Sequence, residues 1–301
     1  MNRDRRTLYG ILILLGILTF MWGLAVVAHF GYFHYIAAKL SLLKGSPAAA
    51  IEGTSFLYSF NVDGTLEETA TSELSPSPYW WLDSGGELRI KDGVGSTVVG
   101  ELATLSRWRV AYGKSNPIDS DNGYHPQNIF RLVGRTIWRD VRAETSFRIL
   151  ADRINQSPHR NESNGLLLMT RYLDGDNLYY AGIRVDGTAV IKKKYRGIYY
   201  TLAQRQIFSG SYNASTSPNL LPHDTWLTLR VEVKNLFNGS VSISLSLQRE
   251  GDPEGSWTKV LEVIDDGRNA EMTNPISSGG YVGIRTDFMD VEFKDFRLER
   301  I

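Results

Sequence analysis

The sequence predicts an all-β protein, a two-sheet antiparallel sandwich preceded by a single transmembrane α-helix. Three observations support this class. Leu8 to Ala28 contains no charged residue. From about Thr54 onward, short apolar runs alternate with Gly, Pro, Asn and Asp clusters at spacings of roughly 8–12 residues, which is typical of sandwiches and barrels. Several of these runs alternate strictly between apolar and polar residues, as half-buried strands do.

The N-terminal segment is predicted to anchor the chain in a cell membrane as a single-pass protein. Residues 8–28 would form a helix about 30 Å long, which is enough to cross a hydrocarbon core. Residues 1–7 carry three arginines against one aspartate and favour a cytoplasmic N-terminus. Residues 29–53 would form a juxtamembrane segment and linker, and residues 54–301 an extracytoplasmic sandwich. The alternative is a cleaved signal peptide ending at Ala28, but the long apolar run favours the retained anchor.

The charge balance and the lack of cysteine exclude several classes of function. Lys plus Arg and Asp plus Glu number 33 each, so no global charge favours a nucleic acid or an acidic partner. The chain contains 0 Cys, which excludes disulfides, thiolate metal sites and a cysteine nucleophile. The hydrophobic content of 42% is sufficient for a sizeable core.

The first half of the predicted sandwich has the less regular pattern. Its short strand candidates are Ser55–Val62, Tyr79–Leu82, Glu87–Lys91 and Thr97–Val99. The polar stretch Lys114–Asn128 is expected to form a long loop.

The second half alternates more cleanly. Val141–Leu150 and Trp226–Lys234 place apolar residues at every second position, so each predicts a strand with one buried face. Asn238-Gly239 predicts a turn into a third such strand, which begins at Val241. These strands are expected to form one wall of the sandwich.

Two further strands, Tyr281–Thr286 and Asp290–Arg300, are predicted to close the chain. In the second of them the apolar alternation changes parity between Phe293 and Phe296. A one-residue slip of this kind is what a β-bulge produces, so we expect a bulge at Lys294-Asp295.

Leu178 to Gln204 predicts a three-strand meander with turns at Asp186-Gly187 and Arg196-Gly197. A two-residue turn at Asp186-Gly187 would pair Tyr180 with Lys193, and the next turn would pair Lys193 with Tyr200. Directly paired residues share a face of the sheet. We therefore expect one face to present Tyr180, Lys193 and Tyr200 in a row, with Arg184 and Gln204 nearby.

These segments together resemble a known superfamily. The stretches that carry the resemblance are Leu178-Tyr-Tyr-Ala-Gly-Ile-Arg-Val-Asp-Gly, Trp226-Leu-Thr-Leu-Arg-Val-Glu-Val-Lys, Gly280-Tyr-Val-Gly-Ile-Arg-Thr and Val291-Glu-Phe-Lys-Asp-Phe-Arg-Leu. In order and spacing the chain is similar to the concanavalin A-like lectin/glucanase superfamily, especially its laminin-G-like and family-16-hydrolase-like branches. The resemblance implies a two-sheet jelly roll whose concave sheet often receives a glycan, and sometimes a structural calcium ion near the meeting of the chain's ends.

The predicted face has the chemistry of a polysaccharide groove. Aromatic rings stack on the apolar faces of sugars, while Lys, Arg and Gln side chains bond to hydroxyls or carboxylates. An ordinary solvated sheet face with cross-strand Tyr–Lys contacts is the alternative. For calcium, Asp295 at the expected bulge is the candidate ligand, because calcium takes oxygen ligands and the resemblance places an ion nearby.

Catalytic patterns are weaker. Glu250-Gly-Asp252-Pro-Glu254 superficially matches the carboxylates of family-16 hydrolases, but its Gly and Pro residues indicate a turn. A lyase would need a Tyr or His base beside a cation. Side chains of those types are His125, Tyr195, Tyr199, Lys192 and Arg205, and no spacing connects them.

The sequence therefore predicts a membrane-anchored, extracytoplasmic module that binds a polysaccharide and does not bind nucleic acid. A membrane-tethered glycan hydrolase or lyase is the second hypothesis. A structural subunit of a cell-envelope complex, with a protein partner, is the third.

Overall fold

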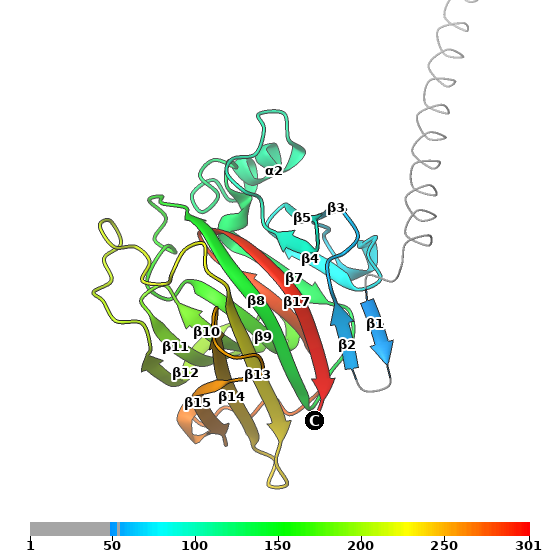
Figure 1. The fold of residues 1–301 in the computed structure, drawn as a ribbon, viewed down its shortest axis with the longest axis vertical. Coiled ribbons are helices and arrows are strands. Elements are labelled where there is room, and N and C mark those ends of the chain that lie inside the picture. The colour runs from blue at the N-terminus through cyan, green and yellow to red at the C-terminus, as the bar shows by residue number, and fades with distance from the viewer. Residues whose placement is uncertain (1–48, 53–54) are drawn as a thin grey trace, which may run out of the picture. The chain divides into compact units, whose positions relative to one another are not determined.

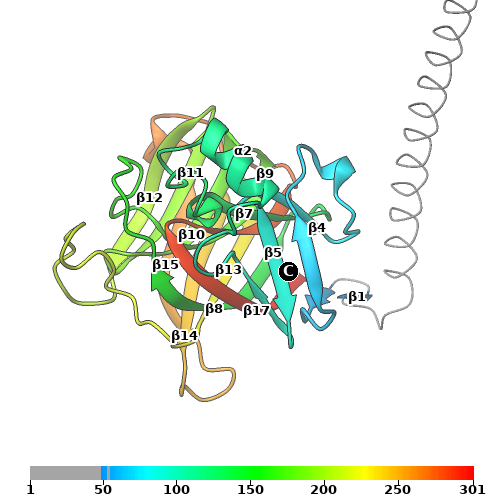
Figure 2. The same ribbon diagram turned by 90° about the horizontal axis from the view of Figure 1, so that it is seen from above.

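The computed structural model describes residues 49–52 and 55–301, whose strands pair into two antiparallel sheets. These residues belong to one compact unit, Pro47–Ile301. In Figure 1 the strands labelled β8, β13 and β17 lie in front of β9 and β10, and Figure 2 shows the same two layers from above. The predicted membrane helix, Leu8–Ala28, lies outside the described residues. Within them, no helix is both long and apolar enough to span a bilayer.

The first sheet contains ten strands in the order β15-β14-β13-β8-β17-β6-β5-β3, with β2 also paired to β17 and β1 to β2. Their bounds are β1 Ala49–Glu52, β2 Ser55–Tyr58, β3 Gly64–Glu67, β5 Glu87–Lys91, β6 Val94–Ser96, β8 Val141–Asp152, β13 Leu227–Asn235, β14 Val241–Arg249, β15 Thr258–Asp265 and β17 Met289–Arg300.

The second sheet contains seven strands in the order β12-β11-β10-β9-β16-β7-β4. Their bounds are β4 Trp80–Ser84, β7 Phe130–Gly134, β9 Gly165–Asp174, β10 Asn177–Arg184, β11 Thr188–Tyr195, β12 Ile198–Gln206 and β16 Tyr281–Thr286. The helical elements described are short: α2 Arg107–Ser115, η1 Ser72–Leu74, η2 Pro126–Ile129 and η3 Arg268–Ala270.

The core between the sheets follows the predicted alternation. On β8 the inward side chains, all buried, are Val141, Ala143, Thr145, Phe147 and Ile149. The alternate apolar positions of β13 and β14 are buried in the same cluster as Leu168 and Ala181 of the opposite sheet. The strands predicted in the second half of the chain are therefore confirmed, and so is the two-sheet sandwich.

The last strand contains the predicted bulge. The pairing of β17 with β8 shifts register between Lys294 and Arg297. Asp295 has a left-handed backbone there, with φ 54°. The change of apolar parity between Phe293 and Phe296 is explained by this bulge, because both side chains are fully buried on the same side of the sheet.

The first half differs from the prediction at two places. Thr97–Val99 is not a strand; the strand is β6, which ends before it. The strand predicted over Ser55–Val62 ends at Tyr58, because Phe60 adopts a left-handed backbone with φ 53° and is fully buried. The polar stretch after α2 is a loop as expected, except for η2 at its end.

The meander of β10, β11 and β12 is confirmed, but one of its turns is a residue longer than predicted. The Gly187 amide donates to the Arg184 carbonyl at 2.9 Å. Ile183 therefore pairs with Ala189, and Tyr180 with Lys192. The predicted pairing of Tyr180 with Lys193 is wrong, and a one-residue change of register turns every following side chain to the other face.

The second turn has the predicted form. Arg196 and Gly197 both have positive φ, 51° and 83°, and Tyr195 pairs with Ile198 across a two-residue turn. Lys193 then pairs with Tyr200 as predicted.

Candidate functional site

The predicted ligand-binding residues are divided between two faces of the seven-stranded sheet. Tyr180, Arg184 and Gln204 belong to the face turned away from the inter-sheet core, which we call the outer face. Lys193 and Tyr200 belong to the opposite face, so the row predicted to contain them with Tyr180 does not exist.

Lys193 is a core residue. Its side chain is fully buried, and its Nζ lies 2.8 Å from the Asp265 carboxylate. Tyr179 donates a hydrogen bond to the same carboxylate at 2.6 Å. Arg184 is also engaged within the protein, because its guanidinium lies 2.7 Å from Asp186 and its Nε donates to the Glu162 carbonyl.

The outer face carries its own apolar cluster. Its buried members are Val133, Leu167, Met169, Tyr172, Leu178, Tyr180 and Val190, with Trp81 and Tyr281 packed against them. This cluster is separate from the inter-sheet core. Its seven buried members are at most 7% exposed, so they form a packed layer beneath the more exposed side chains of the outer face.

Tyr180, Tyr199 and Arg285 form a compact group on this face, which we call the tyrosine–arginine cluster. Arg285 Nη1 donates to the Tyr180 hydroxyl at 2.9 Å. The ring of Tyr199, from the edge strand β12, stacks on the Tyr180 ring at a centroid distance of 6.1 Å. Asp287 accepts from Arg285 Nε at 3.0 Å and holds the guanidinium in place.

The cluster shifts the pKa values of its members in opposite directions. Burial raises the pKa of Tyr180, although Arg285 opposes that shift. Burial also acts to raise the pKa of Tyr199, but Arg285 and Lys194 outweigh it and lower the pKa below the usual value. Burial lowers the pKa of Lys192, and the positive charge of Arg184 lowers it further.

A pocket of about 360 Å³ lies on the same face. Three aromatic side chains, Trp81, Tyr172 and Tyr281, line it together with Asp83 and other residues. Trp81 Nε1 donates to the Thr69 carbonyl at 2.9 Å, which fixes the plane of the indole. We call this site the aromatic pocket, and its volume falls within the range of about 300–1,000 Å³ typical of ligand sites.

An ion pair supplies the polar groups of the aromatic pocket. Arg131 Nε lies 2.6 Å from the Asp83 carboxylate. Burial raises the pKa of Asp83, and the charge of Arg131 opposes the shift. Burial also raises the pKa of Tyr172 to about 12, so its hydroxyl stays protonated at neutral pH and is able to donate a hydrogen bond.

Strand pairing places the pocket beside the cluster. Arg131 of β7 pairs directly with Arg285 of β16, and Arg285 pairs with Leu167 of β9. Directly paired side chains lie on one face about 5 Å apart. The aromatic pocket and the tyrosine–arginine cluster therefore form one continuous surface across the sheet.

Several residues of this surface were not predicted. Trp81 and Asp83 lie two residues apart on β4, and Tyr281 and Arg285 lie four residues apart on β16. Alternation along these two strands would have placed each pair on a shared face. Which strands lie next to each other in the sheet is set by long-range pairing, and the sequence does not contain a local signal for it.

Other candidate groups have structural partners. Glu250, Asp252 and Glu254 lie in the turn between β14 and β15, as expected, and Asp252 accepts from the Arg249 amide at 2.8 Å. Within residues 49–52 and 55–301, no three His, Asp or Glu side chains gather as a metal site would require. Calcium binding at Asp295 stays a prediction.

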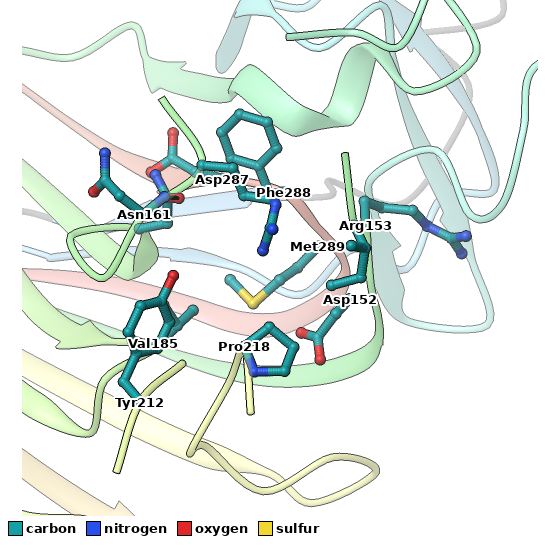
Figure 3. A pocket seen from close by; sticks show the side chains of 12 residues that line it. Asp152, Arg153, Asn161, Val185, Tyr212, Pro218, Asp287, Phe288 and Met289 are labelled. Carbon is teal, nitrogen blue, oxygen red and sulfur yellow. Dashed lines mark hydrogen bonds between the residues drawn. The ribbon is translucent and has the colours of Figure 1, made fainter. Parts of the chain in front are cut away.

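A second cavity lies at one end of the sandwich, among side chains that include Asp152, Asn161, Tyr212 and Met289 (Figure 3). Its free volume is about 10 Å³. That is the space of about one water molecule. It is too small to hold a sugar.

No protein-family model matches this chain, and no curated protein matches it. Among solved structures, the chain is similar to the carbohydrate-binding module CBM66 from Bacillus subtilis, with 10% identity and a TM-score of 0.44, over 73% of this chain and 94% of that one. It is similar to a Bacillus licheniformis beta-glucanase, with 8% identity and a TM-score of 0.42, over 83% of this chain and 100% of that one. It is also similar to the Ca2+/Man-bound exoplasmic/lumenal domain of VIP36, with 10% identity and a TM-score of 0.40, over 79% of this chain and 89% of that one.

These three structures are concanavalin A-like jelly-roll sandwiches, the class that the sequence resembles. The architecture of this chain rests on its own strand pairing. No activity is carried over from these structures.

Proposed function

We propose that this protein binds a polysaccharide on the outer face of its seven-stranded sheet, as a membrane-anchored module displayed outside the cytoplasm. The observation that carries the proposal is the aromatic pocket, which Trp81, Tyr172 and Tyr281 line together with the ion pair of Asp83 and Arg131. The anchor is the predicted helix Leu8–Ala28.

The pocket combines the two kinds of contact that sugars require. The partly exposed rings of Trp81 and Tyr281 offer apolar faces for the C–H faces of sugar rings, and the fixed Trp81 indole loses little entropy on binding. Asp83 supplies acceptors and Arg131 supplies donors for sugar hydroxyls. Among the described residues, neither the Tyr172 nor the Tyr281 hydroxyl has a hydrogen-bond partner, so both are free to bond a ligand.

The arrangement favours binding over hydrolysis. A glycosidase needs two carboxyl groups that face each other across the scissile bond. The two carboxylates that line the aromatic pocket are Asp83 and Asp174. Asp83 is paired with Arg131, and Asp174 accepts from the Asp176 amide at 2.8 Å and from Asn177, which closes the β9–β10 turn.

The test is a glycan-array screen of the full-length chain, followed by affinity measurement for Trp81→Ala. We expect the substitution to weaken binding at least tenfold, about 1.4 kcal/mol. Trp257→Ala is the matched control, because Trp257 stacks with Arg230 on the ten-stranded sheet. Unchanged binding by Trp81→Ala, or no glycan bound by the wild-type chain, would refute the proposal.

A lyase is the second candidate, and the tyrosine–arginine cluster favours it. Of the side chains predicted for a lyase, Tyr199 and Lys192 both lie on the outer face, next to Tyr180 and Arg285. A Tyr199 phenolate would remove the proton α to a uronate carboxylate, a C=C bond would form, and the glycosidic C–O bond would break as its oxygen takes a proton. Accumulation of unsaturated, shortened oligosaccharides with the purified chain, and their absence with Tyr199→Phe, would establish this activity.

A further inference from the structure

We infer that the polysaccharide bound by the outer face is a polyuronate, and that Lys192, beside Tyr199, holds one of its carboxylates. This inference rests on the proposed function, because it names the class of ligand for the same face. The site is separate from the aromatic pocket, which neither Lys192 nor Tyr199 lines.

Among the residues that the structure describes, Lys192 differs from the other cations of the outer face in having no carboxylate within ion-pair distance. The cations with a carboxylate partner are Arg131 with Asp83 at 2.6 Å, Arg184 with Asp186 at 2.7 Å, Lys194 with Asp176 at 3.0 Å and Arg285 with Asp287 at 3.0 Å. Within the part of the chain that the structure describes, Lys192 has neither an ion pair nor a hydrogen bond.

The surroundings of Lys192 make an unpaired cation costly. The side chain is half-buried, and it pairs across strands with Tyr180, which is 2% exposed. Burial lowers the pKa of Lys192, as do the positive charges of Arg184 and Arg285, while Tyr199 and the Asp186 carboxylate act against this shift from beyond ion-pair distance. A partly desolvated charge without an opposite partner destabilises the protein, and a bound anion would remove that penalty.

Tyr199 supplies a platform at the same place. It is 49% exposed and stacks on Tyr180. Lys194 Nζ lies 5.0 Å from the centroid of its ring. A partly exposed ring beside an unpaired ammonium group suits a sugar that carries a carboxylate, because the ring contacts the sugar face while the ammonium group contacts the charge.

The spacing of the two sites indicates a polymer. Lys192 lies on β11 and Arg131 of the aromatic pocket on β7, four strands apart in the order β11-β10-β9-β16-β7. At about 4.8 Å between strands, the separation is about 19 Å. A single sugar is too short to reach both sites, so an extended chain lying across the strands is the ligand that uses the whole face.

The test compares the full-length chain on three kinds of polymer. The first are polyuronates (alginate and polygalacturonate), the second are the same polymers with their carboxylates reduced to alcohols, and the third is dextran sulfate. We expect the wild-type chain to bind at least one polyuronate and to bind its reduced form at least tenfold more weakly. Lys192→Met should lose at least tenfold in affinity for the polyuronate and bind the reduced polymer as the wild type does.

Lys234→Met is the matched control, because Lys234 is an exposed strand lysine on the ten-stranded sheet with no ion pair described. It should bind every polymer as the wild type does. Equal binding of the reduced and unreduced polymers would overturn the carboxylate site and leave the proposed function standing. Binding of dextran sulfate as tight as that of the polyuronate would also overturn it, in favour of a general anion site. Failure to bind any glycan would refute the proposed function itself.

Discussion

Lys193 Nζ lies 2.8 Å from the Asp265 carboxylate, with both side chains fully buried between the sheets. Lys193 comes from β11 of the seven-stranded sheet and Asp265 from β15 of the ten-stranded sheet, so the ion pair connects the two layers. The Tyr179 hydroxyl and the Gly267 amide also donate to Asp265, and the carbonyls of Thr273 and Asn274 accept from Lys193. Removing one member of a buried ion pair is strongly destabilising, because the other charge stays buried without a partner.

We predict that Lys193→Met destabilises the protein by about 3–5 kcal/mol, because it leaves the Asp265 carboxylate buried without a cation. Urea denaturation followed by circular dichroism measures the change. Lys192→Met, one residue away on the outer face, should not destabilise the protein, because it removes a half-buried cation that has no ion pair. Equal stability of the two variants would show that the buried pair is not formed.

The pair of Asp152 and His223 should make stability depend on pH. His223 Nε2 lies 3.2 Å from Asp152. The hydrogen bond to Asp152 raises the pKa of His223 above 6.5. Burial would raise the pKa of Asp152, but the hydrogen bonds from His223 and Asn219 outweigh it and lower that pKa below 3.8.

The directions of these two pKa shifts define the pH range in which the pair stabilises the folded protein. The His223 contribution is fully present below pH 6.5 and is lost as the pH rises through its raised pKa. The Asp152 contribution is fully present above pH 3.8 and is lost as the pH falls through its lowered pKa. The pair should therefore stabilise most between these values. In denaturation measured from pH 5 to 8, His223→Gln should remove the part of the decline that the wild type shows above pH 6.5; an unchanged profile would contradict the pairing.

Tyr199 should ionise earlier than the buried tyrosines. Its pKa is lowered because Arg285 and Lys194 outweigh the effect of burial. Burial raises the pKa of both Tyr58 and Tyr172 to about 12. In an ultraviolet titration of the folded chain with rising pH, Tyr199→Phe should remove a tyrosine ionisation at the lower end of the range. Tyr172→Phe should remove one at the upper end. If Tyr199→Phe instead removed an ionisation at high pH, the positive charge of Arg285 would not act on Tyr199.

The turn that sets the register of β11 depends on Gly187. Its φ is +79°, and a Cβ there would lie 2.3 Å from the Phe208 carbonyl oxygen. Gly187→Ala should cost about 1–2 kcal/mol for the left-handed backbone, and more for the contact. Gly239→Ala is the control, because Gly239 has φ +83° and nothing within 4 Å of an added Cβ. Chemical denaturation should show the larger loss for Gly187→Ala, and equal losses would contradict the described turn.

The sequence by itself determined the all-β two-sheet class of the described residues, most strand positions in the second half of the chain and the bulge at Asp295. These features depend on the local alternation of apolar and polar residues. That alternation indicates which side chains of a strand are buried, independently of the strands beside it. Three residues of the outer face, Tyr180, Tyr199 and Lys192, also lie within the predicted meander, whereas the residues of the aromatic pocket lie outside it.

Only the tertiary structure decided which face each residue occupies and which strands meet. The β10–β11 loop has three residues and not two, and that single residue placed Lys193 in the core and Lys192 on the outer face. Arg131 and Arg285 are adjacent because β7 and β16 pair, although they are far apart in the chain. Strand order arises from long-range packing of the two sheets, and an alternating pattern within one strand carries no information about its neighbour.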